Sequence, residues 1–246
     1  MIEEKKPFTS HLKELRDRLV VSLIGLGVAF IITYSVKERI FHFLMRPFIE
    51  VMPPHSSFIF TSITEAFITY FKVSIVAALF LASPLILYEV WMFVSPGLYE
   101  KEKRYIAPFI IFGSVFFLAG ALFCYYVTMP VVYHFFVSYA GRMIVPMPSL
   151  KDYMSLTLKL LVIFGLVFQM PLVAYYLAKA GIINYRMLSK KRRYAILGIV
   201  VLSAIITPPE VSSQLLMALP MYGLFELSVV IARVFGKKEV VNGGAA

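Results

Sequence analysis

The sequence has a single cysteine, Cys124, which lies inside an apolar run. An intramolecular disulfide or a cysteine-based metal site is therefore excluded. Charged residues are also scarce, at 15% of the 246 residues, whereas about a quarter of a soluble domain is charged. Hydrophobic residues make up 60% of the chain, more than a soluble fold can bury. We predict a membrane protein with several spans and no sizeable soluble domain.

Catalytic signatures are missing as well. The sequence contains no HExxH helix, CxxC pair, P-loop or GxSxG elbow. The four histidines lack metal-ligand spacing, and the serines at membrane depth have no neighbouring histidine. We therefore expect no catalytic residue, no metal site and no cofactor, and we do not interpret the chain as an enzyme.

Apolar runs set the predicted architecture, which is one polytopic domain over 1–246. A run of about 18 residues can cross the hydrocarbon core as a helix. The candidate spans are 19–36, 66–94, 106–129 and 154–180, followed by two weaker runs at 194–207 and 215–232. The N-terminal segment is too charged for a cleavable signal peptide, so we expect the first span to be retained. Residues 237–246 are expected to be a disordered tail.

The two weaker runs leave two alternatives open. The run 194–207 would rise only about 21 Å as a helix, against a core of about 30 Å. The pair is either a re-entrant hairpin or two short spans in a thinned bilayer. With six spans and the N-terminus inside, 17 Lys and Arg residues fall inside and 5 outside. This bias indicates that both termini are cytoplasmic, so the net charge of +10 has a topological explanation and no nucleic-acid partner is expected.

An outer loop carries a further helical pattern. Ile40, Phe41, Leu44 and Phe48 recur at helical spacing, which predicts a helix that caps the outer face and bends at Pro47. Residues 128–143 are expected to form a second cap.

Three polar side chains fall where lipid disfavours them. Glu89 lies near the inner end of its span, where headgroup exposure explains it; Glu226 and Gln169 lie deeper. Such groups face the protein interior or water. Gln169 is uncharged, so an interhelical hydrogen bond is as good an interpretation as a functional role.

The segment TSHLKELRDRL, residues 9–19, precedes the first span. As a helix it places Glu14 and Arg18 at i and i+4, the favourable order for a surface ion pair. A second acidic cluster, with Glu100 and Glu102 beside Phe93, lies on the same predicted membrane face. Carboxylates match the guanidinium fork, so the two clusters together could receive a ligand with two arginines.

Four segments resemble one family in order and spacing. They are HLKELRDRL, SPLILYEVWMFVSPGLYEKEKR, FGLVFQMP and TPPEVSSQLLMALPMYGLFE. On these segments the chain resembles the TatC component of the twin-arginine protein translocase, over nearly its whole length. The resemblance implies an all-α protein of the plasma (inner) membrane with six spans, the last two short, and both ends in the cytoplasm.

The resemblance also implies a receptor for twin-arginine signal peptides of folded cargo. Its implied partners are single-span proteins of the TatA and TatB type, further copies of itself and membrane lipids, with the proton-motive force driving export. By position, Glu14, Arg16, Phe93 and Glu102 match the signal-peptide site. Thr207 and Gln214 match positions where partner helices are thought to dock, and Pro47 and Pro84 match structural prolines.

One departure from the family pattern concerns Gln169, since the family usually has glutamate there. A mechanism that needs a proton on this side chain is thereby put in doubt, whereas hydrogen bonding to a partner helix survives. Glu210 in place of a common aspartate is a milder change.

From these residues we hypothesise that Glu14 and Glu102 recognise consecutive arginines, that Arg16 orients the carboxylates or holds the loop, and that Phe93 borders the pocket. A second hypothesis is that the short final spans thin the bilayer locally. The alternatives are a secondary transporter, which should show paired repeats, and a lipid-modifying enzyme, which lacks a catalytic constellation.

Overall fold

The computed structural model describes residues 8–53, 57–59, 62–94, 106–138, 147–207 and 211–236. In this part of the chain the only non-helical pairing is an isolated bridge between Ile59 and Ser149, so the all-α prediction is confirmed. The chain divides into two compact units, Met1–Val162 and Ile163–Ala246. Glu102, Glu210 and the predicted tail at 237–246 lie outside the described residues.

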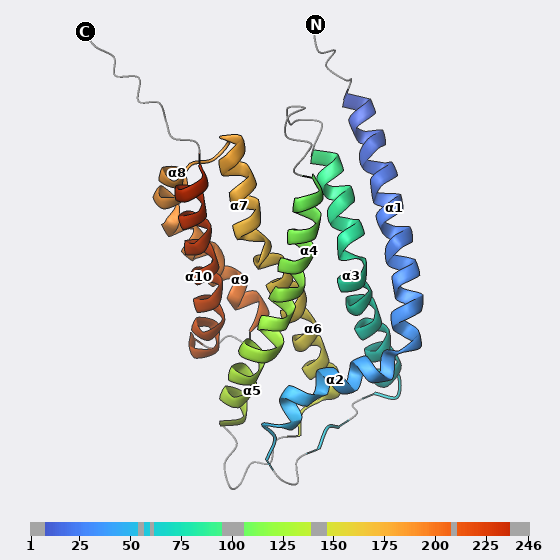
Figure 1. Cartoon of the computed structure of the whole chain (residues 1–246). Coiled ribbons are helices and arrows are strands. Elements are labelled where there is room, and N and C mark those ends of the chain that lie inside the picture. The colour runs from blue at the N-terminus through green and yellow to red at the C-terminus, as the bar shows by residue number, and fades with distance from the viewer. Residues whose placement is uncertain are drawn as a thin grey trace, which may run out of the picture. The chain divides into compact units, whose positions relative to one another are not determined.

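Long helices form the first unit (Figure 1). Its elements are α1 Phe8–Ser35, α2 Lys37–Ile49, α3 Glu65–Val94, α4 Ile106–Phe123, a π-helical turn Cys124–Thr128, α5 Met129–Ser138 and the start of α6 Leu150–Val167. The helices α1, α3 and α4 run alongside one another, and α2 leads from the end of α1 across α3 to α5 (Figure 1). The predicted cap at 128–143 is helical as far as Ser138, and residues 139–146 lie outside the described structure.

Small residues bring α1 close to α3. Ala29 on α1 packs with Ala78 and Ala82 on α3 in a buried cluster. A side chain at Gly25 would overlap Leu85 of α3, whereas Gly27 has open space around it. Close backbone approach of this kind is how helices associate in lipid, where apolar surface alone gives no preference for a neighbouring helix.

The helix α2 follows the predicted pattern. Leu44 and Phe48 are buried, Ile40 and Phe41 are partly buried, and Pro47 lies inside the helix. The buried face meets an aromatic cluster in which the ring of Phe48 lies 4.9 Å from Tyr153 and 5.1 Å from Tyr133. The amphipathic sequence of this segment therefore forms a helix because one face has a core to join.

Two helical prolines leave backbone carbonyls that hydroxyl groups satisfy. Proline has no N–H, so the carbonyl four residues earlier loses its helical donor. Pro47 affects Phe43, whose oxygen accepts a 2.7 Å hydrogen bond from the Tyr125 hydroxyl. Pro84 affects Phe80, whose oxygen accepts a 2.8 Å hydrogen bond from the Ser83 hydroxyl. Such replacement donors allow prolines inside helices at membrane depth.

A buried carboxylate joins the start of α3 to the start of α6. Glu65 is 3% exposed and accepts hydrogen bonds from the backbone N–H of Lys151 at 2.6 Å and from the Ser149 hydroxyl at 3.1 Å. It also accepts one from the N–H of Ser62 at 3.2 Å. These hydrogen bonds offset the cost of burying the charged group and hold the loop ends together.

The second unit contains the end of α6, α7 Gln169–Ala180, α8 Tyr185–Lys190, α9 Arg192–Ile206 and α10 Val211–Phe235. Helix α10 packs against α7 and α9. Helix α7 ends at Gly181, whose backbone has the left-handed conformation. At the start of α8 the side chain of Asn184 accepts a hydrogen bond from the backbone N–H of Met187.

The last helix corrects one prediction. Helix α9 has 15 residues and rises about 22 Å, in agreement with the predicted short helix. Helix α10 has 25 residues and rises about 37 Å, so the prediction of a short last span is wrong. The predicted run 215–232 already included Pro220 and Glu226. The helix is longer at both ends, from Val211 and to Phe235, because helical hydrogen bonding continues into flanking polar residues such as Ser212 and Arg233, which hydropathy excludes.

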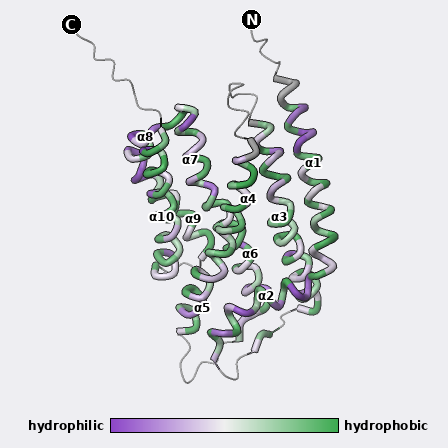
Figure 2. Tube along the Cα trace, in the orientation of Figure 1, coloured by the Kyte–Doolittle hydropathy of each residue, from purple (hydrophilic) through white to green (hydrophobic). Residues whose placement is uncertain are grey.

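Five segments of the described chain are long and apolar enough to cross a membrane. They are Leu12–Ser35, Glu65–Phe93, Pro108–Ser138, Leu150–Ala180 and Val211–Phe235. Hydrophobic residues line these segments in Figure 2. The sixth span, the orientation and the single-domain assignment stay predictions.

Candidate functional site at the start of the first helix

The first turns of α1 carry the charged segment that precedes the first apolar run. Leu12, Leu15 and Leu19 lie on one face and are all more than 40% exposed, which suits contact with lipid. Hydrophilic residues at this end give way to hydrophobic ones along α1 (Figure 2). The charged side chains thus lie where the helix reaches the edge of its apolar stretch.

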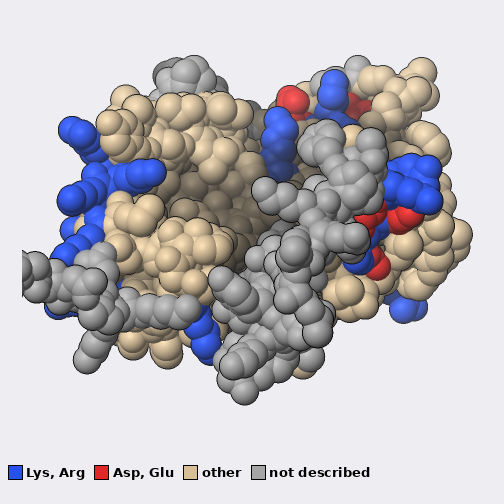
Figure 3. Space-filling model, turned by 90° about the horizontal axis from the view of Figure 1, so that it is seen from above, with Lys and Arg blue, Asp and Glu red and all other residues tan. Residues whose placement is uncertain are grey.

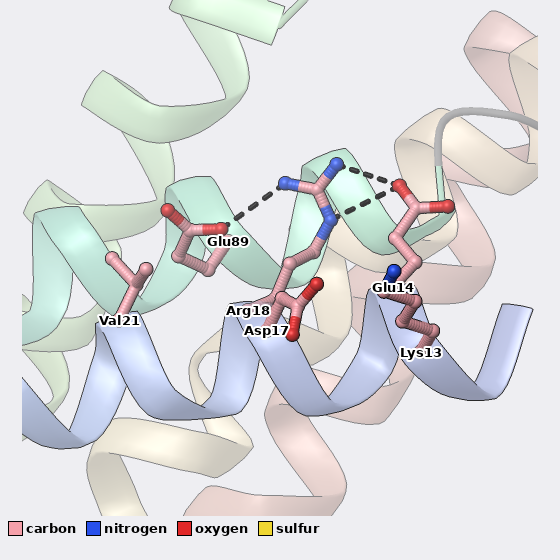
Figure 4. Close-up of a pocket in the computed structure, with 6 residues that line it drawn as sticks. All are labelled: Lys13, Glu14, Asp17, Arg18, Val21 and Glu89. Carbon is pink, nitrogen blue, oxygen red and sulfur yellow. Dashed lines mark hydrogen bonds and ion pairs between the residues drawn. The ribbon is translucent and has the colours of Figure 1, made fainter. Parts of the chain in front are cut away.

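A pocket of about 500 Å³ opens beside this segment. Its lining residues are Lys13, Glu14, Asp17, Arg18 and Val21 from α1 and Glu89 from α3. All six are drawn in Figure 4. Three carboxylates against two cationic groups make the lining slightly acidic, which favours a cationic ligand.

Arg18 bridges two carboxylates inside this pocket (Figure 4). Its Nη2 lies 2.7 Å and its Nε 3.2 Å from Oε1 of Glu14, and its Nη1 lies 3.1 Å from Oε2 of Glu89. The side chains of Arg18, Glu14 and Glu89 are 21%, 24% and 10% exposed. A partly dry pair of this kind is stronger than an exposed one, and the guanidinium fork fixes its geometry.

The predicted i, i+4 pair between Glu14 and Arg18 is confirmed. The prediction that Glu89 is exposed to headgroups is wrong, because its side chain is only 10% exposed. Its side chain points instead to Arg18, which is 71 residues away in the chain. One feature of the sequence could have indicated that Glu89 belongs to this site. Glu89 and Glu14 are both acidic, and both fall at the same predicted membrane face of neighbouring spans.

Arg16 lies outside this bridge. Its Nη2 is 2.6 Å from Oδ1 of Asp17, and both side chains are more than half exposed. In the space-filling view, acidic side chains on this face lie next to basic ones (Figure 3). The predicted role of Arg16 in orienting the carboxylates stays a prediction.

Phe93 lies four residues after Glu89 on α3 and is partly buried. This spacing places the two residues on the same face of the helix, one turn apart. The predicted aromatic border and the newly found carboxylate therefore belong to the same helix end. The structure does not describe Glu102, so its predicted position near Glu14 stays a prediction.

The described part of the chain holds no group of three or more His, Cys, Asp or Glu side chains placed to bind a metal ion. Chemically, the pocket offers two carboxylates that already hold a guanidinium. It can exchange one cationic group for another, and it offers no nucleophile activated by a base.

The residues predicted to contact partner helices lie in the second unit. Gln214 on α10 donates from Nε2 to the carbonyl oxygen of Val200 on α9 at 2.9 Å. Thr207 is buried and donates to the carbonyl oxygen of Ser203 at 2.9 Å. Both residues thus lie at the junction of α9 and α10. Gln169 is the first residue of α7, just after the break that separates α6 from α7.

Glu226, which the sequence interpretation left without a role, joins α10 to α9. Its Oε2 lies 2.8 Å from Nη2 of Arg192, and its Oε1 accepts a 2.8 Å hydrogen bond from the Tyr222 hydroxyl. The side chain of Glu226 is 29% exposed, and that of Arg192 is 47% exposed. These partners offset the cost of a carboxylate within an apolar helix.

The chain matches known proteins over nearly its whole length. Residues 10–220 match the family model described as Sec-independent protein translocase protein (TatC). A TatC protein of Desulforapulum autotrophicum is 48% identical over 96% of this chain and 88% of its own length. The Escherichia coli TatC protein is 34% identical over 95% of this chain and 91% of its own.

Solved structures agree with the sequence relatives. A crystal structure of a twin-arginine translocase receptor, TatC, superposes with a TM-score of 0.83 at 37% identity, covering 90% of this chain and 97% of that one. A second crystal structure of TatC, in DDM, superposes with a TM-score of 0.84 at 36% identity, covering 91% and 99% of the two chains.

Proposed function

Since this chain belongs to the TatC family of Sec-independent protein translocase proteins, we propose that it is the subunit that binds twin-arginine signal peptides. It is a multi-pass membrane protein and a component of the twin-arginine translocase. The family is a protein translocase component and not an enzyme. Family membership therefore decides against the solute transporter and the lipid-modifying enzyme.

The observation that carries the proposal is the guanidinium held by Glu14. The carboxylate of Glu14 takes two hydrogen bonds from Arg18 inside a pocket, at 2.7 and 3.2 Å. An arginine of a signal peptide carries the same chemical group. A site that holds one guanidinium by geometry and charge is suited to hold another.

The partly dry setting supplies the energy for such recognition. A fully exposed ion pair contributes about 0–1 kcal/mol, too little to select a peptide. A hydrogen bond to a charged group in a desolvated site contributes about 1.5–3 kcal/mol. Glu14 is 24% exposed at its side chain and so lies between these limits. Lysine lacks the planar fork and would gain less at such a site.

Glu102, Arg16 and Phe93 complete the proposed site. The proposal places Glu102 across the pocket from Glu14, so that consecutive arginines meet two carboxylates. Phe93 would contact the apolar part of the signal peptide, since it lies one turn from Glu89. Arg16 would hold the loop that carries Glu102.

The proposed partners are single-span proteins of the TatA and TatB type, with docking near Gln169, Thr207 and Gln214. The position of Thr207 and Gln214 supports this assignment, because both are polar residues at the α9–α10 junction among apolar ones. The proposal further includes an inner-membrane location with cytoplasmic termini, contacts with lipids, homo-oligomers within the complex and export driven by the proton-motive force.

The experiment is Glu14→Gln in the full-length protein in nanodiscs, with binding of a labelled twin-arginine signal peptide measured. We expect affinity to fall about tenfold, since a charge-assisted bond becomes a neutral one. Glu50→Gln is the matched control, because Glu50 is exposed beyond the end of α2 and far from the pocket in sequence. Glu102→Gln should reproduce the effect.

Unchanged affinity of Glu14→Gln, together with an unchanged preference over a twin-lysine peptide, would reject the role of Glu14. If the unmodified protein binds the twin-arginine peptide no better than a scrambled one, the receptor function itself fails.

A further inference from the structure

We propose that Arg18 is an internal competitor that occupies the acidic pocket in the free receptor, and that a signal-peptide arginine binds by displacing it from Glu14 and Glu89. This inference rests on the proposed function and adds two residues to it, one that regulates access to the site and one that binds the ligand.

The first step is the position of the Arg18 guanidinium. It uses three nitrogens on two carboxylates from two helices, at 2.7, 3.2 and 3.1 Å. This is the arrangement that a guanidinium ligand requires, and Arg18 already fills it (Figure 4). A ligand arginine that binds Glu14 through the same oxygen must therefore take the place of Arg18.

The second step is the state of Glu89. Its side chain is 10% exposed, and Arg18 is the cationic partner that the structure gives it. A carboxylate this buried needs a partner, because desolvation of an uncompensated charge is costly. When Arg18 leaves, Glu89 gains most from a new guanidinium. It is thus placed to bind one arginine of the peptide.

The third step is the freedom of Arg18 to move. Its side chain is 21% exposed, and it lies in α1 directly before the uncharged run that begins at Leu19. A long arginine stem can swing toward the membrane interface while its methylene groups stay on apolar surface. Displacement therefore needs a rotamer change of one side chain and no rearrangement of α1 or α3.

Competition of this kind has a defined consequence for affinity. The apparent dissociation constant rises in inverse proportion to the fraction of free receptor whose site is open. The same factor applies to every ligand that needs the open site. Removing Arg18 should therefore tighten twin-arginine and twin-lysine peptides by the same factor.

The test compares Arg18→Gln with the unmodified protein, full length and in nanodiscs, for both peptides. We expect both to bind about fivefold more tightly, which corresponds to a site open in about a fifth of free molecules. Weaker or unchanged binding of the twin-arginine peptide would overturn the inference, because Arg18 would then orient the carboxylates or play no part.

Two control variants separate competition from general charge. Lys13→Gln removes one positive charge from the lining of the same pocket. It should tighten binding less than twofold. Arg192→Gln breaks an Arg–Glu pair between α9 and α10 in the other unit and should leave binding unchanged. An equal gain from Lys13→Gln would count against displacement.

The contribution of Glu89 is measured in the background that lacks the competitor. Adding Glu89→Gln to Arg18→Gln should lower the affinity for the twin-arginine peptide about tenfold relative to Arg18→Gln alone. An unchanged affinity in this pair would show that Glu89 serves only to hold Arg18.

Arg18→Gln leaves Glu89 without its partner and can lower the stability of the protein. Arg18→Lys keeps the charge and places an amine that a carbodiimide can join to a neighbouring carboxylate. Saturating twin-arginine peptide should reduce the yield of the crosslink between positions 18 and 89 several-fold. An unchanged yield with bound peptide would overturn displacement, whereas a peptide that does not bind at all would instead reject the proposed function.

Discussion

The Tyr125 hydroxyl donates a 2.7 Å hydrogen bond to the carbonyl oxygen of Phe43, the residue four places before Pro47. The two aromatic rings stack, with centroids 4.3 Å apart and planes 8° from parallel. One side chain in the π-helical turn Cys124–Thr128 thus supplies the donor that a proline in α2 lacks. The predicted structural role of Pro47 gains a physical reason in this contact.

Tyr125→Phe tests this contact. The substitution keeps the stacked ring and removes the donor, so the Phe43 carbonyl loses its replacement partner. We expect the free energy of unfolding to fall by about 1 kcal/mol, measured by thermal unfolding in detergent. Tyr126→Phe is the control, because Tyr126 is 64% exposed, and it should change stability little. Equal effects of the two substitutions would contradict the assignment.

Ser83→Ala addresses the second helical proline. The Ser83 hydroxyl donates to the Phe80 carbonyl, which has no helical N–H because residue 84 is proline. Its loss should cost about 1 kcal/mol. Ser114→Ala is the matched control. Ser114 is also buried, and its hydroxyl donates to the carbonyl oxygen of Ile110, which still has its helical N–H donor. Should Ser114→Ala prove the more costly change, the explanation for Pro84 is wrong.

Gly25→Leu probes the approach of α1 to α3. A side chain at Gly25 meets Leu85, so the two helices must separate or repack, at a cost of about 1–3 kcal/mol. Gly27→Leu has the same helix propensity and open space, so it should be neutral or slightly stabilising. Thermal unfolding of both variants in the same detergent gives the comparison; a neutral Gly25→Leu would mean that the helices tolerate separation.

Lengthening α9 tests the proposed thinning of the bilayer. The helix has 15 residues, and four added apolar residues would extend it by about 6 Å. We expect transport of a folded twin-arginine substrate to fall at least fivefold while peptide binding in nanodiscs is retained, because mismatch with the bilayer is relieved. Equal loss of transport and peptide binding would point instead to misfolding.

Local properties of the sequence were enough to predict the membrane environment, the helix α2 and one ion pair. The membrane environment follows from hydropathy, which depends on composition alone. The pair of Glu14 and Arg18 follows from i, i+4 spacing, because four residues complete about one helical turn. The amphipathic helix α2 follows from the spacing of Leu44 and Phe48. In each case the interacting groups are near neighbours along the chain.

Tertiary structure decided what depends on packing between distant segments. Glu89 meets Arg18 across 71 residues, and Tyr125 meets Phe43 across 82, so no local pattern could pair them. Glu226 on α10 meets Arg192 on α9 across 34 residues, so the partner of this carboxylate within an apolar helix depends on how the two helices pack. Hydropathy and helical period act over a few residues, whereas the partner of a buried polar group is chosen by which helices pack together. The sequence therefore determined the membrane environment, most helices and the local pair of Glu14 and Arg18, and the fold alone determined which distant polar groups meet.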